Sequence, residues 1–368
     1  GDDSTRVLLY GLLSILFIVA FIYTWRLQVK QCRICMDITA KGKKIKSGKD
    51  DLRSLLDDQF HKTLLALPLT GILIFTVMPL VFMILVAFTN YDSMNDGYIN
   101  NLFDWVGLDN WNTMLSWGDG TVQYSATLGE ILAWTLIWAF FATFTNYFLG
   151  MFVAIAINKK GIKLKKFWRT ALVMTIAIPQ FVSLLYVSKM FAADGLINGT
   201  LMNWGWIKEP LPFWTDPTWA KCTIIGINIW IGIPYLMLIA TGILMNIPSD
   251  LYESARIDGA NAFQTYMKIT LPYMLFVTGP YLLTSFTGNI NNFNVIFLLS
   301  GGKPLSVSMA GNAGSTDLLI TWLYKMTVTD SNYKLAAVMG ILVFVVCAVI
   351  NLVVYNLIPS VKNEEDFQ

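Results

Sequence analysis

Charged residues are scarce in this chain of 368 amino acids. Asp, Glu, Lys and Arg make up 14% of it, whereas they make up about 25% of an ordinary soluble domain. Hydrophobic residues make up 55% and gather in long continuous runs. This composition argues against a secreted enzyme, a nucleic-acid-binding protein and a disordered tail. It predicts an all-α protein that crosses a membrane several times.

Seven apolar runs are long enough to cross the ~30 Å hydrocarbon core of a bilayer as helices. They cover 7–25, 64–88, 131–157, 167–190, 222–246, 270–298 and 335–358. A basic stretch separates the first run from the other six. We therefore divide the chain into an N-terminal transmembrane helix with a basic loop, 1–63, and a six-helix transmembrane core, 64–368.

Lysine and arginine are distributed unevenly among the loops. The stretch 26–63 holds ten, 158–166 together with Arg169 holds six, and 89–130 holds none. Basic residues near the ends of membrane spans stay in the cytoplasm. This rule places the loops 26–63, 158–166 and 247–269 and the tail from 359 inside the cell. It places 89–130, 191–221 and 299–334 outside.

Seven crossings with a cytoplasmic C-terminus put Gly1 outside the cell. Because the chain starts without Met, we expect at least one further helix upstream in the native protein. The alternative is that 7–25 is a signal anchor or a peripheral helix.

Ionisable side chains are absent from the seven segments, apart from their ends. Proton- and ion-coupled carriers usually depend on such groups within the membrane. A transporter of this composition is therefore expected to take its energy from a partner. The polar groups that remain are mainly amides, at Asn228, Asn289, Asn291, Asn292 and Asn294.

Neutral amides can donate and accept hydrogen bonds, which suits a neutral ligand rich in hydroxyl groups. The alternative is that they join neighbouring helices. Helix-breaking residues lie in the same two segments, at Gly232, Pro234, Gly279, Pro280 and Gly288. Together with the amides they predict a polar pathway between the fifth and sixth segments.

Residues for catalysis and metal binding are few. Histidine occurs once, at His61, and the single C-x-x-C pair, Cys32 and Cys35, has no second pair. Incidental thiols are therefore favoured over a zinc or redox role. The run 42–50 lacks the glycine spacing of a phosphate-binding loop and has Asp50 where that loop needs Ser or Thr. We expect no metal site, no bound cofactor and no enzymatic activity of the chain itself.

The loop 247–269 has the pattern of a short helix followed by a turn. Ser249 can cap the helix, and Asp250 and Glu253 suit its positive end. Gly259 can end it in the left-handed conformation. An apolar face remains without a partner inside the loop. This pattern predicts either a helix lying on lipid headgroups or a helix that docks on another protein.

One string in this loop carries a family resemblance. Glu253-Ser254-Ala255-x-x-Asp258-Gly259-Ala260, followed by Ile269-x-Leu271-Pro272, resembles the "EAA" loop of binding-protein-dependent ABC importer permeases of the carbohydrate type. Ser254 stands where the family usually has Ala. The resemblance implies a type I ABC importer permease fold. It also implies that these six residues, Glu253 to Ala255 and Asp258 to Ala260, couple the chain to an ATPase subunit.

The resemblance extends over about 220–358 to permeases of the maltose/maltodextrin type. Asn228-Ile229-Trp230-Ile231-Gly232-Ile233-Pro234-Tyr235 is similar to their N-x-W-x-G-x-P-Y stretch, which implies sugar contacts by Asn228, Gly232 and Tyr235. Residues 285–293 are similar to their S-F-x-F-N-F-N-N-F stretch, which implies sugar contacts by Asn289 and Asn292. Gly288 stands where the family has an aromatic residue that stacks on the sugar, so the site is expected to be roomier.

The expected function is that of a multi-pass permease subunit in the bacterial cell membrane, importing an oligosaccharide similar to maltodextrin. The resemblance implies three kinds of protein partner: a second homologous permease, two ATP-binding cassette subunits that use ATP and Mg²⁺, and an extracellular solute-binding protein. The outer loop 89–130, with Trp105, Trp111 and Trp117, either docks that binding protein or anchors at the bilayer edge. The alternatives are a secondary sugar carrier without an ATPase and a membrane scaffold.

Overall fold

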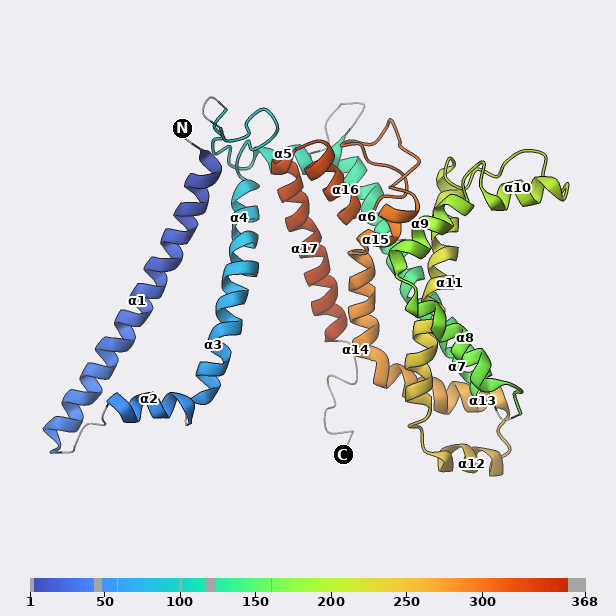
Figure 1. Ribbon diagram of the computed structural model, residues 1–368, viewed down its shortest axis with the longest axis horizontal. Helices are drawn as coiled ribbons and strands as arrows, with labels where there is room; N and C mark the ends of the chain where they lie inside the picture. The colour runs from blue at the N-terminus through green and yellow to red at the C-terminus, as the bar shows by residue number, and fades with distance from the viewer. Residues whose placement is uncertain are drawn as a thin grey trace. The chain divides into compact units, whose positions relative to one another are not determined.

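The computed structural model describes residues 3–42, 48–57, 59–98, 101–116, 123–159 and 161–356 (Figure 1). Within these ranges the regular structure is helical, and β-structure is limited to isolated bridges. Among the described residues, six helices are long and apolar enough to cross a membrane, and a bent pair raises the count of spans to as many as seven. The predicted all-α transmembrane fold is confirmed. Trp117 and the tail from 359 lie outside the described residues.

The chain divides into two compact units. The first comprises residues 1–112 and 331–338, and the second comprises 113–330 and 339–368. The first unit begins with α1 (Ser4–Ala40), and Asp3 caps this helix by accepting a hydrogen bond from Arg6 N at 3.1 Å.

Helix α1 is longer than the predicted segment 7–25, because it continues through much of the stretch expected to be a loop. No glycine or proline occurs between Gly11 and Gly42, and Gly42 has a φ of +67° where the helix has ended. The short helix α2 (Gly48–Leu56) follows α1. The second span of the unit, Phe60–Val86, consists of α3 (Phe60–Ile72), the π-helical turn η1 (Leu73–Val77) and α4 (Met78–Val86).

Polar and aromatic contacts hold the loop that follows α4 in the first unit. The ammonium of Lys334 lies 2.6 Å from a carboxylate oxygen of Asp92. The rings of Tyr91 and Tyr333 stack with centroids 4.6 Å apart. The buried carboxamide of Asn110 donates to the carbonyl oxygens of Ala87 and Thr89. These contacts join the loop after α4 to the start of α17 (Tyr333–Tyr355) and to α5 (Asp109–Leu115).

The second unit begins with a long span, Tyr124–Asn158, built from α6 (Tyr124–Phe140), the π-helical turn η2 (Phe141–Thr145) and α7 (Asn146–Asn158). The predicted segment 167–190 is a bent pair and not one straight helix. Helices α8 (Lys165–Met174) and α9 (Gln180–Met190) meet at 92°, because Ile178 is extended before Pro179. The short 3₁₀ turn η3 (Thr175–Ala177) completes α8, and α10 (Leu196–Asn203) follows α9.

The fifth span is α11 (Pro217–Leu244), capped by Asp216. The sixth is continuous from α13 (Ala262–Thr265) through the π-helical turn η4 (Tyr266–Thr270) to α14 (Leu271–Ile290). Contrary to expectation, neither Pro234 nor Pro280 ends its helix, since one proline removes a single hydrogen bond from a long ladder. The predicted segment 270–298 instead breaks at Asn291, and α15 (Phe293–Leu299) is a separate helix.

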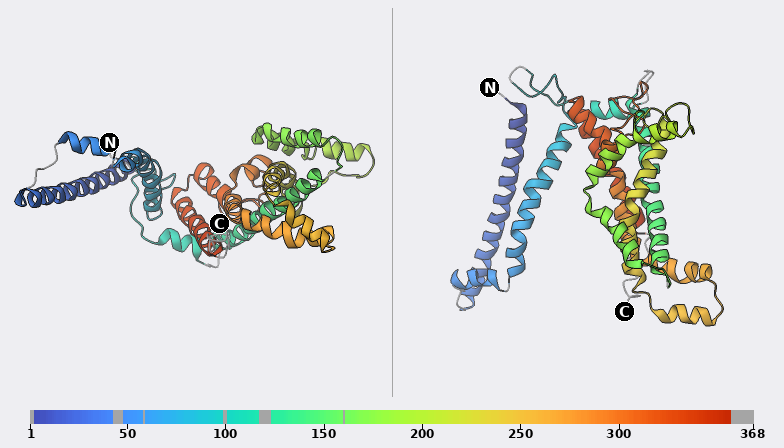
Figure 2. Two further views of the ribbon diagram at one scale, coloured as in Figure 1. Left: turned by 90° about the horizontal axis from the view of Figure 1, so that it is seen from below. Right: turned by 45° about the vertical axis from the view of Figure 1, so that its right-hand side comes forward.

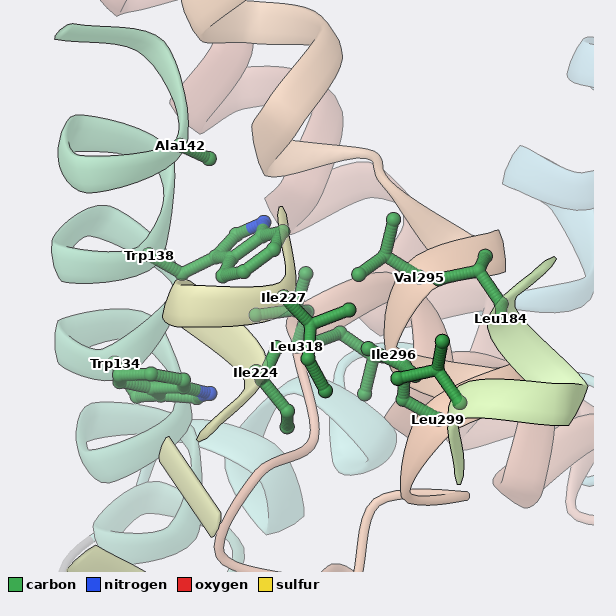
Figure 3. Close-up of a cluster of buried hydrophobic side chains, with 11 residues drawn as sticks. Trp134, Trp138, Ala142, Leu184, Ile224, Ile227, Val295, Ile296, Leu299 and Leu318 are labelled. Carbon is green, nitrogen blue, oxygen red and sulfur yellow. The ribbon is translucent and has the colours of Figure 1, made fainter. Parts of the chain in front are cut away.

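Tryptophan and aliphatic side chains form the core of the second unit at its centre. Trp134 and Trp138 of α6 pack with residues of α9, α11 and α15 (Figure 3). A second cluster, around Met151, Met237 and Met274, joins α7, α11 and α14. The two clusters hold these spans together on both sides of the polar residues described below.

A buried ion pair closes the loop 300–318 of the second unit. Asp317 is fully buried, and its carboxylate accepts hydrogen bonds from Gly314 N at 2.7 Å and from Lys325 Nζ at 2.6 Å. Burial raises the pKa of Asp317, and the neighbouring Lys325 opposes this shift. The pair ties the loop to η5 (Lys325–Thr329), which follows α16 (Leu319–Tyr324).

Candidate substrate pathway and coupling loop

A row of hydrogen-bonded polar side chains crosses from the end of α14 to the η2 turn. Asn292 donates through Nδ2 to Oδ1 of Asn289 at 3.3 Å, and Asn289 donates through Nδ2 to Oγ1 of Thr143 at 3.0 Å. The indole of Trp138 donates to the backbone carbonyl of Asn289 at 3.1 Å. Asn292 also caps α15 by accepting from Val295 N at 3.3 Å. The structure therefore brings together Asn289 and Asn292, as the sequence predicted, and links them to the third span.

Asn146 continues this row one helical turn further along the same face. Its side chain is buried, and its Nδ2 donates to the carbonyl of Ala142 at 2.9 Å and to that of Asn228 at 3.5 Å. Its Oδ1 is buried without a hydrogen-bond partner. A buried amide oxygen of this kind calls for a donor, because leaving it unpaired costs roughly 1–3 kcal/mol. We refer to Thr143, Asn146, Asn228, Asn289 and Asn292 as the polar row.

The predicted site residues of α11 occupy three different environments. Asn228 is buried, at 8% exposure, and joins the polar row through its backbone carbonyl, which accepts from Asn146 Nδ2. Gly232 lies against the carboxamide of Asn146, so closely that a Cβ atom built there would be 2.5 Å from Nδ2. Tyr235 is 52% exposed and lies outside the buried cluster. The geometry gives Gly232 a role in the close approach of α7 and α11.

Open space surrounds Gly288, one residue before Asn289. A Cβ atom built at this position meets no heavy atom within 4 Å. The backbone at Gly288 is helical, so its conformation does not require glycine. Gly288 therefore lies on an exposed face of α14, next to Asn289 of the polar row.

Two members of the polar row, Thr143 and Asn146, were not among the predicted site residues. The signal for them is present in the sequence, because three polar residues, Thr143, Thr145 and Asn146, lie close together in the largely apolar run 131–157. Inside a bilayer such groups need partners in neighbouring helices. Which partners they find depends on how the helices pack, and the sequence pattern does not show that.

The predicted coupling loop is a helical hairpin at one end of the second unit (Figure 2). It consists of α12 (Ser249–Ile257) and the start of the sixth span at α13. Ser249 is the first helical residue and bonds the side chain of Asp250 at 3.3 Å, so it does not cap the backbone as expected. The predicted end at Gly259 is correct: its φ is +77°, Gly259 N donates to Arg256 O, and Ala260 N donates to Ala255 O.

The hairpin is anchored to the spans and exposes the rest of its surface. The hydroxyl groups of Tyr252 and Thr270 lie 3.1 Å apart, which joins α12 to η4. A capping box between Asn261 and Gln264 starts α13. Glu253, Ser254, Asp258 and Gly259 are exposed, whereas Ala255 and Ala260 are half-buried. Large apolar side chains also face outward, with exposures of 45% for Leu251, 87% for Ile257 and 71% for Phe263.

These features define a class: a multi-pass helical membrane protein with a polar row inside its spans and an anchored, outward-facing helix at one end. Residues 146–363 match the family of binding-protein-dependent transport system inner membrane components. The chain belongs to this family and is a permease component of such a transport system.

The chain is similar to permeases of known sugar transport systems. It is 34% identical over 366 residues to the galactooligosaccharides transport system permease protein GanP of Bacillus subtilis (strain 168), covering 99% of this chain and 85% of that protein. It is 32% identical over 381 residues to the maltodextrin transport system permease protein MalC of Streptococcus pneumoniae (TIGR4), covering 99% and 84%.

The fold is similar to that of a chain in a bacterial alginate ABC transporter, solved in complex with an alginate pentasaccharide-bound periplasmic protein. The TM-score is 0.65 at 21% sequence identity, and the match covers 83% of this chain and 95% of that one.

Proposed function

We propose that this chain imports an oligosaccharide across the bacterial cell membrane as one permease subunit of an ATP-driven importer, with maltodextrin as the first candidate substrate. The observation that carries this proposal is the polar row. It places neutral amide and hydroxyl groups inside three spans, with Asn146 Oδ1 unpaired and open space at Gly288. The relatives named above, which transport maltodextrins and galactooligosaccharides, support the class of substrate.

The chemistry of the polar row fits a sugar. A carbohydrate presents hydroxyl groups that donate and accept, and amides can satisfy both. In the proposed site Asn228, Asn289 and Asn292 contact the sugar, Tyr235 lines its path, and Gly232 keeps α7 and α11 close. Since charged groups are lacking at this depth, the energy comes from a partner ATPase and not from an ion gradient.

The proposed partners follow from the family and from the exposed surfaces. A second homologous permease would cover the side on which Tyr235 is exposed. Two ATP-binding cassette subunits would bind ATP and Mg²⁺ and receive α12, with Glu253 to Ala255 and Asp258 to Ala260 at the contact. The C-terminus would be cytoplasmic.

An extracellular solute-binding protein would complete the importer on the outer side. The loop 89–130 is its proposed docking surface. Within that loop the indole of Trp105 is 62% exposed, which suits such a contact. Trp111 is half-buried, with its ring 6.1 Å from that of Phe88, which suits an internal packing role better.

Transport in proteoliposomes tests the proposal. The chain is reconstituted with its partner permease, ATPase and binding protein, and uptake of labelled maltodextrin is measured with ATP, without ATP and without the ATPase subunits. We expect uptake only in the complete system with ATP. Uptake driven without the ATPase would identify a secondary carrier instead. Competition by unlabelled galactooligosaccharide then decides between the two classes of sugar.

A further inference from the structure

A basic cavity lies at the ends of three spans in the second unit, away from the polar row. It measures about 600 Å³ and lies between the end of α7, the start of α8 and the end of α11. Three of its lining residues carry a positive charge, and none carries a negative charge. Its lining consists of Asn158, Lys165, Lys166, Arg169, Thr170, Leu244 and Met245.

A neutral residue fixes the positions of two of these cations. Asn158 Oδ1 accepts from Arg169 Nη2 at 2.7 Å, and the backbone carbonyl of Asn158 accepts from Lys165 Nζ at 3.3 Å. Asn158 is itself held by its Nδ2, which donates to Thr241 Oγ1 at 3.1 Å. Because the partner is an amide and not a carboxylate, the cations are positioned while their charge stays uncompensated.

The electrostatics of the cavity call for an anion. Among the ion pairs of the described residues, none involves Lys165, Lys166 or Arg169. The Nε atom of Arg169 is buried without an acceptor. A buried charged donor without a partner carries a large desolvation cost, which an incoming anion removes. The first turn of α8 has no acidic residue and no side-chain cap, so its positive end adds to the same field.

The surroundings of the cavity favour a lipid as the source of that anion. Leu244 and Met245 form an apolar side of the cavity, and Met245 is 74% exposed. Phe167 and Trp168 beside it are 60% and 52% exposed, as is usual for aromatic residues at a bilayer interface. A soluble anion needs the cations alone, whereas a lipid also uses the apolar side and the adjacent bilayer. Basic pockets at the ends of membrane helices are known to hold anionic headgroups.

We propose that this cavity binds the phosphate headgroup of an anionic phospholipid, such as phosphatidylglycerol. Arg169 and Lys166 pair with the phosphate, Lys165 is held beside them, and Leu244 and Met245 contact the glycerol and acyl chains. The site is separate from the proposed sugar pathway and does not depend on the nature of the transported substrate.

Native mass spectrometry of the complete, delipidated transporter tests this site. The probes are phosphatidylglycerol and phosphatidylcholine with identical acyl chains. The test variant is Lys166→Gln with Arg169→Gln. The control is Lys159→Gln with Lys163→Gln, which removes two charges from the same loop at exposed positions that do not line the cavity. We expect the wild type and the control to prefer phosphatidylglycerol, and the test variant to lose its affinity roughly tenfold or more.

Three outcomes would overturn the proposal. Equal losses in the test and control variants would mean that diffuse surface charge attracts the lipid. The absence of any preference for phosphatidylglycerol in the wild type would remove the site. Complete displacement of the lipid by excess inorganic phosphate would identify a soluble-anion site instead. Because the contact of Arg169 with Asn158 also supports the fold, Arg169→Lys is a second variant, and its retained charge should keep the lipid bound.

Discussion

Gly232 of α11 lies against the carboxamide of Asn146 in α7, and a Cβ atom at this glycine would be 2.5 Å from Nδ2 and 2.9 Å from Oδ1. One turn further, a Cβ atom at Gly150 would lie 2.6 Å from Cβ of Leu236. Two glycines, one on each helix, therefore set the distance between the third and fifth spans. This distance in turn holds Asn146 in the polar row.

Replacing Gly232 by alanine should disturb both packing and transport. We expect Gly232→Ala to lower stability by about 1–3 kcal/mol, since the added methyl group displaces Asn146 or separates the helices. Sugar uptake should fall as well. The control is Gly226→Ala in the same helix, where a Cβ atom meets nothing within 4 Å. Thermal unfolding of the detergent-purified complex and uptake in proteoliposomes measure the two effects, and equal behaviour of the two variants would contradict this packing role.

The hydrogen bond between Asn289 and Thr143 should appear as a coupling energy. Thr143→Val and Asn289→Leu each remove one partner of this bond. The free-energy loss in maltodextrin affinity should be smaller in the double variant than the sum of the losses in the two single variants. Interhelical hydrogen bonds in membranes couple by about 0.6 kcal/mol on average. The effect is measured as the apparent affinity for maltodextrin in uptake assays. Asn294→Leu, at an exposed position of α15, is the control and should change little.

How much of the fold could be read from the sequence differs between elements. Each of the seven predicted apolar runs is helical in the structure, because the length of a hydrophobic run is a strong signal. Hydropathy alone predicts the ends and bends of these helices less accurately. Helix α1 continues to Ala40 because its sequence contains no glycine or proline between Gly11 and Gly42. The break at Asn291 lies inside the predicted segment 270–298, whose hydropathy indicates one continuous helix.

The candidate site was predictable in its residue types and only partly in its contacts. Asn289 and Asn292 are three residues apart in the chain, so their proximity is local, although the contact is made across the break between α14 and α15 and not within one helix. The link to Thr143 joins residues 146 positions apart in the chain, and only packing decides it. Tyr235, which the resemblance adds to the site, is 52% exposed and lies outside the buried cluster.

The turn at Gly259 supplies a test of the coupling loop through its backbone. Its φ of +77° is costly for residues with a Cβ atom, although a Cβ atom there meets nothing within 4 Å. Gly259→Ala should therefore weaken the end of α12 by about 1–2 kcal/mol and lower maltodextrin-stimulated ATP hydrolysis. Gly259→Asn should be milder, because asparagine tolerates this conformation.

The control in the same loop is Ser249→Ala, at an exposed position of α12 outside the six proposed coupling residues, and it should leave ATP hydrolysis unchanged. If the alanine and asparagine variants at Gly259 lose ATP hydrolysis equally, the backbone explanation fails and a direct contact of this glycine with the ATPase is indicated instead.

The ion pair between Asp92 and Lys334 should make the loop after α4 in the first unit sensitive to acid. Burial raises the pKa of Asp92, but hydrogen bonds from Lys334 and from the backbone of Asn95 and Met94 outweigh it and lower the pKa from 3.8 to about 2. A carboxyl group whose pKa is lower in the folded than in the unfolded state stabilises the fold at pH values above its unfolded-state pKa. This stabilisation is lost as the pH falls through the folded-state pKa. We expect a loss of about 1 kcal/mol after solvent screening, between pH 3.8 and about pH 2.

Hydrogen exchange at the backbone N–H of Lys334, which donates to Tyr91 O at 2.9 Å, reports this local stability. After correction for intrinsic exchange rates, protection in the wild type should decrease across that pH range. In Asp92→Asn it should be lower at neutral pH and almost independent of pH. Asp104→Asn, at an exposed carboxyl of the same loop, should behave like the wild type, and an equal effect of both variants would show that general surface charge is responsible.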